Sequence, residues 1–319
     1  LNLVAGAKII AYTINHSETA LIFTADECKP LISEALYDCE NEIDIISLDP
    51  EFGPMWKEEI PEETFEPVTN IATEEVAVIM YTSGTTGNPK GVMLSHSNLL
   101  AAGRYISSGH DVEHKDVALC VLPIYHINGL CVTVMGTLAS ASTLVIPHRF
   151  SVSAFWRLIE THRCSWFSAV PTQYSYILHN KDMPGKISCL RFARSASAPL
   201  SPEIHRKFEE RFKVPIIETM GLTETGSQIS TNPLPPQTRK IGSPGKAYGN
   251  KLMIGNNVGD EMERGITGEI LVKGDNVMKG YFKQPDETAN TINENGWLKT
   301  GDLGYMDEDG YIFVTGRIK

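Results

Sequence analysis

Several features that would assign this chain to a particular class are missing from its sequence. The six cysteines include no Cys-x-x-Cys pair and no grouping with histidine at zinc-site spacing. A membrane-spanning helix needs roughly 20 apolar residues, whereas glycine, serine and threonine interrupt the most apolar stretch, residues 130–146. No segment has the pattern of a signal peptide. We therefore expect no membrane span and a cytoplasmic location with reduced thiols.

Positive charge is also scarce. The chain has 28 Lys and Arg against 39 Asp and Glu, a formal net charge of −11. This balance argues against a surface for nucleic acid or anionic membrane, although it permits a local basic pocket for phosphates. The 319 residues, with 42% hydrophobic and 21% charged, predict a globular protein of about two domains.

Two common phosphate-binding motifs are absent, and a third kind of loop is present. No two glycines are separated by a single residue, which excludes the dinucleotide fingerprint, and Lys90 lies between Pro89 and Gly91, which excludes a Walker loop. Instead, a glycine- and threonine-rich loop follows the apolar run 76–80, and its glycines allow close backbone approach to phosphates. The predicted phosphate-binding residues are Thr82, Ser83, Gly84, Thr85, Thr86, Gly87 and Lys90. A flexible surface turn with a solvated lysine is the alternative.

The pattern of apolar runs predicts an α/β fold. Short runs rich in Val and Ile alternate with segments of helical period, which is typical of mainly parallel sheets flanked by helices. The expected strands are 20–23, 43–48, 76–81, 118–122, 143–146, 166–170, 190–195 and 215–218. The expected helices are 95–107, 129–139, 151–162, 173–179 and 201–212.

The chain divides into three predicted parts. Residues 1–68 form a partial first α/β lobe with an acidic, proline-containing linker, and residues 69–235 form a nucleotide- and acid-binding lobe. After residue 235, short strands between glycine-rich turns predict a small antiparallel β subdomain over 236–319. The fold expected is thus two helix-flanked lobes plus this subdomain.

Seven motifs occur in one order along the chain: the loop at 81–91, then Leu122–His126, Ala169–Thr172, Ser195–Leu200, Met220–Thr225, Lys299–Gly304 and Gly316–Lys319. In order and spacing the chain resembles the adenylate-forming acyl-CoA synthetase superfamily, closest in pattern to the oxalate–CoA ligase branch and related bacterial acyl-CoA synthetases. The resemblance implies ATP-dependent activation of a small carboxylic acid to an acyl-adenylate, with Mg²⁺, followed by thioester formation with CoA.

The resemblance also implies roles for individual residues. Thr223 would hydrogen-bond the α-phosphate and Glu224 would bind Mg²⁺, and both follow an apolar run whose carboxyl end is a usual ligand position. Asp302 would contact the ribose, and Arg317 would be a second contact to the ribose or a phosphate. Further nucleotide contacts are expected from Ser197, Ala198, Pro199, Met220 and Gly221. A helix cap at Thr223 and an ordinary turn at Asp302 are the structural alternatives.

The acid is expected to meet a second group of residues. His126 matches the position at the carboxylate entrance and, with Lys90, Thr223 and Glu224, completes the predicted catalytic set, although an isolated histidine is often a core residue. The predicted substrate residues are His126, Asn128, Tyr174, Ser195 and Ser227. We expect a small to medium monocarboxylate or short polar acid, with oxalate as the alternative. Arg194 would be the charge available to a second carboxylate, although alternation along a strand places it opposite Ser195.

The ends of the chain resemble a large N-terminal domain truncated on both sides. Lys319 matches the hinge to a C-terminal domain, so we expect the chain to be weak or inactive as a catalyst by itself. Three other interpretations stay open: a ligase that loads a carrier protein, a non-catalytic protein that binds AMP or acyl-adenylate, and an α/β protein with an incidental loop.

Overall fold

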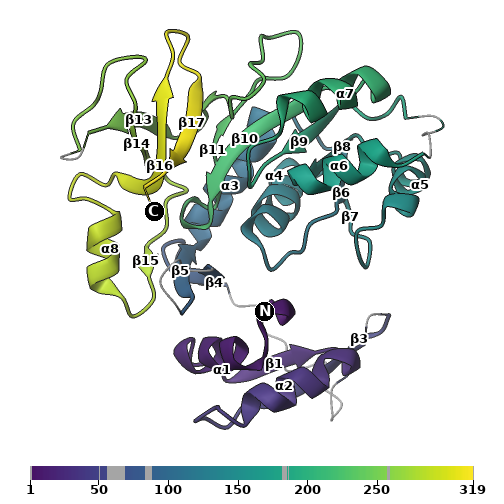
Figure 1. Cartoon of the computed structure of the whole chain (residues 1–319). Coiled ribbons are helices and arrows are strands. Elements are labelled where there is room, and N and C mark those ends of the chain that lie inside the picture. Colours follow the sequence, from purple (N-terminus) through teal and green to yellow (C-terminus); the bar gives the residue numbers. More distant parts are fainter. Residues whose placement is uncertain are drawn as a thin grey trace.

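A computed structural model describes residues 2–49, 51–55, 69–82, 88–181, 185, 187–256 and 259–318. The first 55 residues form a separate lobe, at the bottom of Figure 1. Its sheet pairs β1 (Leu21–Thr24) in parallel with β2 (Asp44–Asp49), and β3 (Gly53–Met55) pairs antiparallel with β2. The helices α1 (Ala7–His16) and α2 (Lys29–Leu36) close a small core around Ile10, Ile14 and Ile32.

A seven-stranded sheet forms the centre of the molecule, with the strand order β12-β11-β10-β9-β8-β6-β7. The strands from β10 to β7 are parallel, and β11 and β12 are antiparallel to their neighbours. The bounds are β6 Val117–Cys120, β7 Thr143–Val145, β8 Trp166–Ala169, β9 Phe192–Ser195, β10 Ile216–Leu222, β11 Ser227–Thr231 and β12 Lys246–Ala247. This confirms the predicted α/β class.

Helices bury both faces of this sheet, because successive strand residues point to opposite sides. On β8, Trp166 belongs to the core beneath α3 and η4, whereas Phe167 belongs to the core beneath α5, α6 and α7. The helices are α3 His96–Gly109, the π-helix η4 Asn128–Met135, α4 Gly136–Ser140, α5 Val152–His162, α6 Pro171–His179 and α7 Pro202–Phe212. The helix expected over 129–139 is thus a π-helix followed by a short α-helix.

The strand expected at 76–81 is not in the parallel sheet. β4 (Val76–Thr82) forms an antiparallel hairpin with β5 (Lys90–Ser95), and β15 (Gly280–Tyr281) pairs with the other edge of β5. Its antiparallel placement was missed because an apolar run does not specify its pairing partner. At the hairpin tip Thr82 pairs with Lys90, so the two ends of the predicted phosphate loop lie side by side.

The C-terminal sheet is antiparallel, as predicted, with the order β13-β14-β16-β17. The bounds are β13 Lys251–Gly255, β14 Gly268–Lys273, β16 Leu298–Met306 and β17 Ile312–Arg317, with α8 Pro285–Thr291 before β16. The end of β17 lies near the middle of the molecule, marked C in Figure 1. None of the helices in the described ranges has the length and apolar character needed to cross a bilayer. The boundaries predicted at residues 68 and 235 stay a prediction.

Candidate active site

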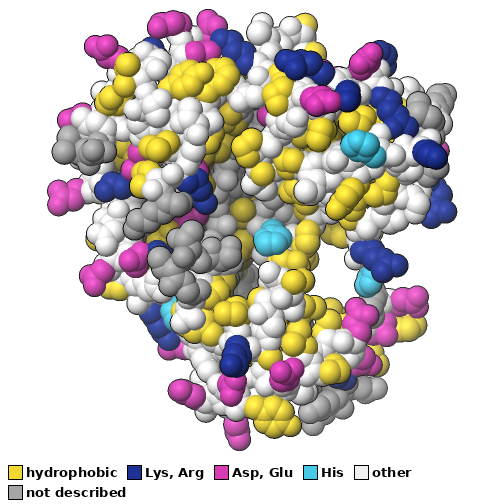
Figure 2. All heavy atoms as spheres, viewed as in Figure 1, with side chains coloured by type: hydrophobic (Ala, Val, Ile, Leu, Met, Phe, Trp, Pro, Cys, Tyr) yellow, Lys and Arg dark blue, Asp and Glu magenta, His cyan; other side chains and the backbone are white. Residues whose placement is uncertain are grey.

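A cavity of about 1220 Å³ lies at the carboxyl ends of the parallel strands. Its walls include Pro123 after β6, Val170 after β8, Ser195 at the end of β9 and Leu222 at the end of β10. Residues 298–302 and 314–318 of the C-terminal sheet form the opposite wall. Figure 2 shows this face of the molecule hollowed near its centre. The carboxyl edge of a parallel sheet is where α/β proteins bind ligands.

Thr223 and Glu224 project into the cavity from a short 3-10 turn, Thr223–Thr225, that directly follows β10. β10 extends to Leu222, beyond the expected residue 218, because its last residues pair with β11. A bulge at Met220 and Gly221 brings the two strands together, and a Cβ on Gly221 would lie 1.8 Å from the Ser227 carbonyl oxygen. Glycine is therefore required at 221.

Two residues that sequence reasoning missed hold the predicted catalytic groups. The Tyr281 hydroxyl donates a hydrogen bond to Glu224 Oε1 over 2.9 Å. Lys90 Nζ lies 5.0 Å from the centroid of the Tyr281 ring and forms an ion pair with Glu287 of α8. Burial, and next the Glu224 charge, raise the pKa of Tyr281, so its hydroxyl remains a donor. No motif marks Tyr281 or Glu287. Tyr281 lies 57 positions from Glu224, and Glu287 lies 197 positions from Lys90.

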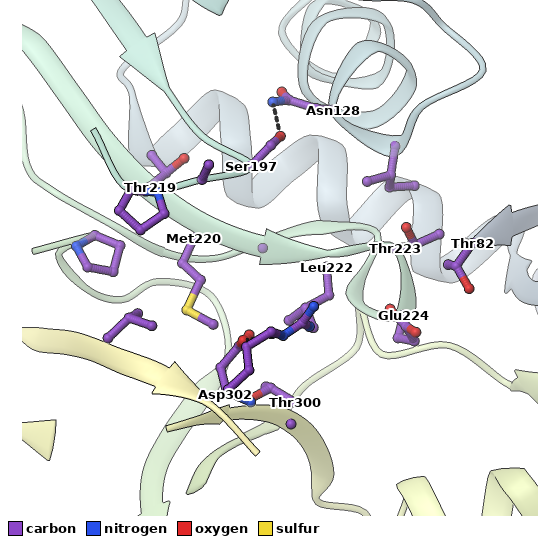
Figure 3. A pocket seen from close by; sticks show the side chains of 18 of the residues that line it. Thr82, Asn128, Ser197, Thr219, Met220, Leu222, Thr223, Glu224, Thr300 and Asp302 are labelled. Carbon is purple, nitrogen blue, oxygen red and sulfur yellow. Dashed lines mark hydrogen bonds and ion pairs between the residues drawn. The ribbon is translucent and has the colours of Figure 1, made fainter. Parts of the chain in front are cut away.

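Asp302 and Arg317, the two predicted ribose or phosphate contacts, face each other across β16 and β17. Arg317 Nε lies 2.7 Å from Asp302 Oδ1, and both residues line the cavity. Burial raises the pKa of Asp302, although the Arg317 charge acts against this rise. Figure 3 shows Asp302 and Thr300 below Met220, and Thr82 beside Thr223 and Glu224. A carboxylate here can accept two hydroxyl groups.

The other end of the cavity is formed by His126, Asn128, Ser195 and Ser197. Burial lowers the pKa of His126, so its imidazole is neutral at pH 7. The Asn128 amide donates from Nδ2 to Ser197 Oγ over 3.1 Å, the bond dashed in Figure 3. Ser197 has a φ of +73°, a strained backbone conformation for a residue with a side chain. Such strain is concentrated at functional sites.

The structure does not bring every predicted residue to the cavity. Tyr174 is 0% exposed and packs on Phe167 and Phe208 beneath α6 and α7. Ser227 is 4% exposed and pairs with Leu222 inside the sheet. Both were proposed from nearness in sequence to a motif, which does not fix the direction of a side chain. The predicted residues that do line the cavity are Thr82, Lys90, His126, Asn128, Ser195, Ser197, Ala198, Pro199, Met220, Gly221, Thr223, Glu224, Asp302 and Arg317.

Some predictions lie outside the described residues. They are Ser83, Gly84, Thr85, Thr86 and Gly87 of the loop, and Lys319 at the predicted hinge. Conversely, the cavity includes residues that no motif argument singled out. Besides Tyr281 they include Glu218, Thr219, Glu269 and Thr315, whereas Leu122, Lys299 and Thr300 belong to the motifs but had no predicted role.

A ligand-sized cavity at the carboxyl edge of a parallel sheet, lined by Thr82 and Lys90 from the two ends of the predicted phosphate loop, is typical of a nucleotide-binding α/β protein. The chain belongs to the AMP-binding enzyme family, whose model matches residues 1–282. The resemblance to adenylate-forming ligases is therefore confirmed.

Individual relatives agree with this family. The chain is 41% identical to the sulfoacetate–CoA ligase of Cupriavidus necator, over 100% of this chain and 62% of that protein. It is 37% identical to the oxalate–CoA ligase of Arabidopsis thaliana, over 79% of this chain and 51% of that protein. Its structure matches ATP-bound MatB from Rhodopseudomonas palustris with a TM-score of 0.87 and 29% identity, over 100% of this chain and 63% of that one.

A further structural match is MenE from Bacillus subtilis in complex with ATP and magnesium ion, with a TM-score of 0.84 and 29% identity over 100% of this chain and 63% of that one. The chain thus spans about three fifths of the length of the relatives that it matches over its whole length.

Proposed function

We propose that the full-length protein activates a carboxylic acid with ATP and transfers the acyl group to CoA. In the first step an oxygen of the acid attacks the α-phosphorus, and pyrophosphate leaves with the electrons of the broken P–O bond. In the second step the CoA thiolate attacks the acyl carbon of the adenylate, and AMP leaves. The observation that carries this proposal is the single cavity that joins Thr223 and Glu224 to Asp302 and Arg317.

Different residues of the cavity wall suit different parts of the nucleotide. Asp302 would accept the ribose hydroxyls, and Thr223 would donate its hydroxyl to the α-phosphate. Lys90 lies next to the loop and would exchange Glu287 for the β- and γ-phosphates, since a phosphate offers the ammonium a stronger charge-assisted hydrogen bond. Met220 lies above Asp302 in Figure 3 and offers a thioether for packing against the base.

Glu224 fits a magnesium ion that is shared with the substrate. Within the described ranges, His, Cys, Asp and Glu form no group of three that would bind a metal without further ligands. Mg²⁺ usually takes only one or two carboxylates and completes its shell with phosphate oxygens and water. The Tyr281 hydroxyl donates its hydrogen bond to Oε1 of Glu224, so Oε2 would be the oxygen that binds the ion. The ion would neutralise the phosphate charge as pyrophosphate leaves.

The comparisons support the second step of the proposed reaction, and the cysteines support a cellular location. The relatives named as CoA ligases support CoA as acceptor. We also propose a cytoplasmic location, which the six free cysteines support, because the cytoplasm keeps thiols reduced.

Acid-dependent ATP–pyrophosphate exchange by the full-length protein tests this function. The change Glu224→Gln removes the ligand charge at constant size, and we expect a loss of about a hundredfold or more. Glu203→Gln is the matched control, because Glu203 is exposed on α7 and forms its ion pair with Lys207 one turn away. Wild-type protein without any acid-dependent exchange would contradict the proposal, and normal exchange by Glu224→Gln would contradict the metal assignment.

A further inference from the structure

Arg194 carries a buried positive charge with no carboxylate beside it. It lies on β9, is 0% exposed, and has no ion pair within the part of the chain that the structure describes. Its Nε also lacks a hydrogen-bond partner among the described residues. By contrast, Arg191 near the start of the same strand pairs with Asp116 at 2.6 Å. Burial lowers the pKa of Arg194 to about 9, so it remains charged at neutral pH.

The groups that contact Arg194 are all neutral acceptors. Nη1 donates to Asn128 Oδ1 at 3.1 Å and to Ser168 Oγ at 3.2 Å, and Nη2 donates to Gln228 Oε1 at 3.3 Å. The nearby His110 ring packs on Phe192, and burial and the Arg194 charge lower its pKa to about 3, so it is uncharged. The cluster therefore keeps a net charge of about +1.

Nearby acidic groups do not balance this charge. Glu218 of the neighbouring strand β10 is held by His205 Nδ1 at 3.0 Å and by the Gly242 N–H at 2.9 Å. Burial raises the pKa of Tyr174 well above its ordinary value, so its hydroxyl stays neutral. An unpaired charge in a protein interior is costly unless an anion meets it. The interior of this lobe is thus prepared for an anion that the described residues do not supply.

The cluster adjoins the acid end of the cavity through Asn128. Alternation along β9 places Arg194 on the sheet face opposite Ser195, as expected. On that face Arg194 contacts η4, whose first residue, Asn128, lines the cavity. Because Arg194 and Ser168 both donate to Oδ1, the amide must present Nδ2 towards Ser197. Ser197 Oγ, which accepts this bond, belongs to an exposed residue of the cavity wall, so its own hydroxyl proton can be donated to a ligand. This wall therefore offers donors backed by a positive charge.

We propose that the acid activated at this site carries a second anionic group, a carboxylate or a sulfonate, and that Asn128 and Ser197 bind it in the field of Arg194. This rests on the proposed acid activation and narrows it to dianionic acids, in place of the monocarboxylate expected from sequence. Arg194 acts through Asn128 and is a positioning residue. Its charge is effective because the surroundings are buried, where electrostatic interactions are stronger than in water.

Hydroxylamine trapping of the acyl-adenylate by the full-length protein tests this with matched acids. Malonate is compared with propionate, succinate with butyrate, and sulfoacetate distinguishes a sulfonate from a carboxylate. We expect kcat/KM for at least one dianionic acid to exceed that of its singly charged counterpart by about 30-fold or more, the effect of one buried charged contact. A preference for propionate, butyrate or longer monoacids would overturn the proposal, while absence of any hydroxamate would instead overturn the proposed function.

Substitution separates recognition from a structural role. Arg194→Met should lose about 30-fold or more on the dianionic acid, mainly through KM, and change the monoacid rate less than about threefold. Arg194→Lys keeps the charge and should restore part of the preference. Arg191→Met is the control, since it removes a partly exposed ion pair beside the same strand and should leave the acid preference unchanged.

Stability gives an independent readout. Without ligand, Arg194→Met should unfold at the same temperature as wild type or higher, because replacing an unpaired buried charge by an apolar side chain is often stabilising. Equal losses on both acid classes together with a lower unfolding temperature would show a structural role and contradict the proposal. If Arg194→Met does not fold, Arg194→Lys and the wild-type acid preference decide the outcome.

Discussion

The hydrogen bond from Tyr281 to Glu224 makes a specific prediction about magnesium. Tyr281→Phe removes one hydroxyl, while the ring remains to pack at a site that is 7% exposed and to contact Lys90. The Glu224 carboxylate then loses the donor that fixes its orientation at 2.9 Å. We expect weaker magnesium binding with an intact fold.

The size of the effect follows from this contact. A hydrogen bond to a charged group contributes about 1.5–3 kcal/mol, which corresponds to roughly 10- to 150-fold in affinity. Loss of a residue that orients a metal ligand typically costs about 10- to 100-fold in metal affinity or activity. We therefore predict that Tyr281→Phe raises the magnesium concentration for half-maximal activity about tenfold or more.

The assay is ATP–pyrophosphate exchange by the full-length protein over a magnesium titration at fixed acid. Tyr248→Phe is the control, because Tyr248 is 37% exposed and lies outside the cavity. A folded Tyr281→Phe protein with the wild-type magnesium dependence would refute the role of Tyr281 in orienting Glu224. A lower maximal rate at the same half-saturating magnesium would also refute it, since the effect would then not act through the metal.

Two further predictions concern the framework of the site. Burial alone would lower the pKa of His205, but its hydrogen bonds to Glu209 and Glu218 raise the pKa above the ordinary 6.5. The resulting stabilisation is complete below pH 6.5 and is lost as pH rises through the folded pKa. The free energy of unfolding in urea should therefore decline over this pH range in the wild type, and His205→Gln should abolish the decline. A free energy of unfolding that rises over the same range would contradict this. Gly221→Ala places a Cβ against the Ser227 backbone and should destabilise the protein by about 1–3 kcal/mol or more. Thermal unfolding should show no comparable loss for Gly316→Ala, where the added Cβ meets nothing within 4 Å, and equal stability of both variants would show that the bulge can adjust.

The contacts that hold the predicted catalytic and acid-binding residues join segments that are remote in sequence. Tyr281 and Glu224 are 57 positions apart, Lys90 and Glu287 are 197 apart, and Arg194 and Asn128 are 66 apart. No local pattern records such pairs, because their geometry depends on how the hairpin, the central sheet and the C-terminal sheet meet. Tyr174 illustrates the same limit of local patterns. It closely follows a motif in sequence, but its side chain points into the core beneath α6.

The sequence by itself determined the α/β class, the antiparallel character of the C-terminal sheet and the positions of Thr223, Glu224, Asp302 and Arg317. The first two follow from local periodicity, and the four residues follow from short motifs that resemble those of the family. Only the tertiary structure decided that β4 belongs to a hairpin, that Tyr281 holds Glu224, and that Arg194 lies buried behind Asn128 with no carboxylate partner among the described residues. The reason is physical: strand pairing, burial and unpaired charge are properties of surfaces that meet only when the chain has folded.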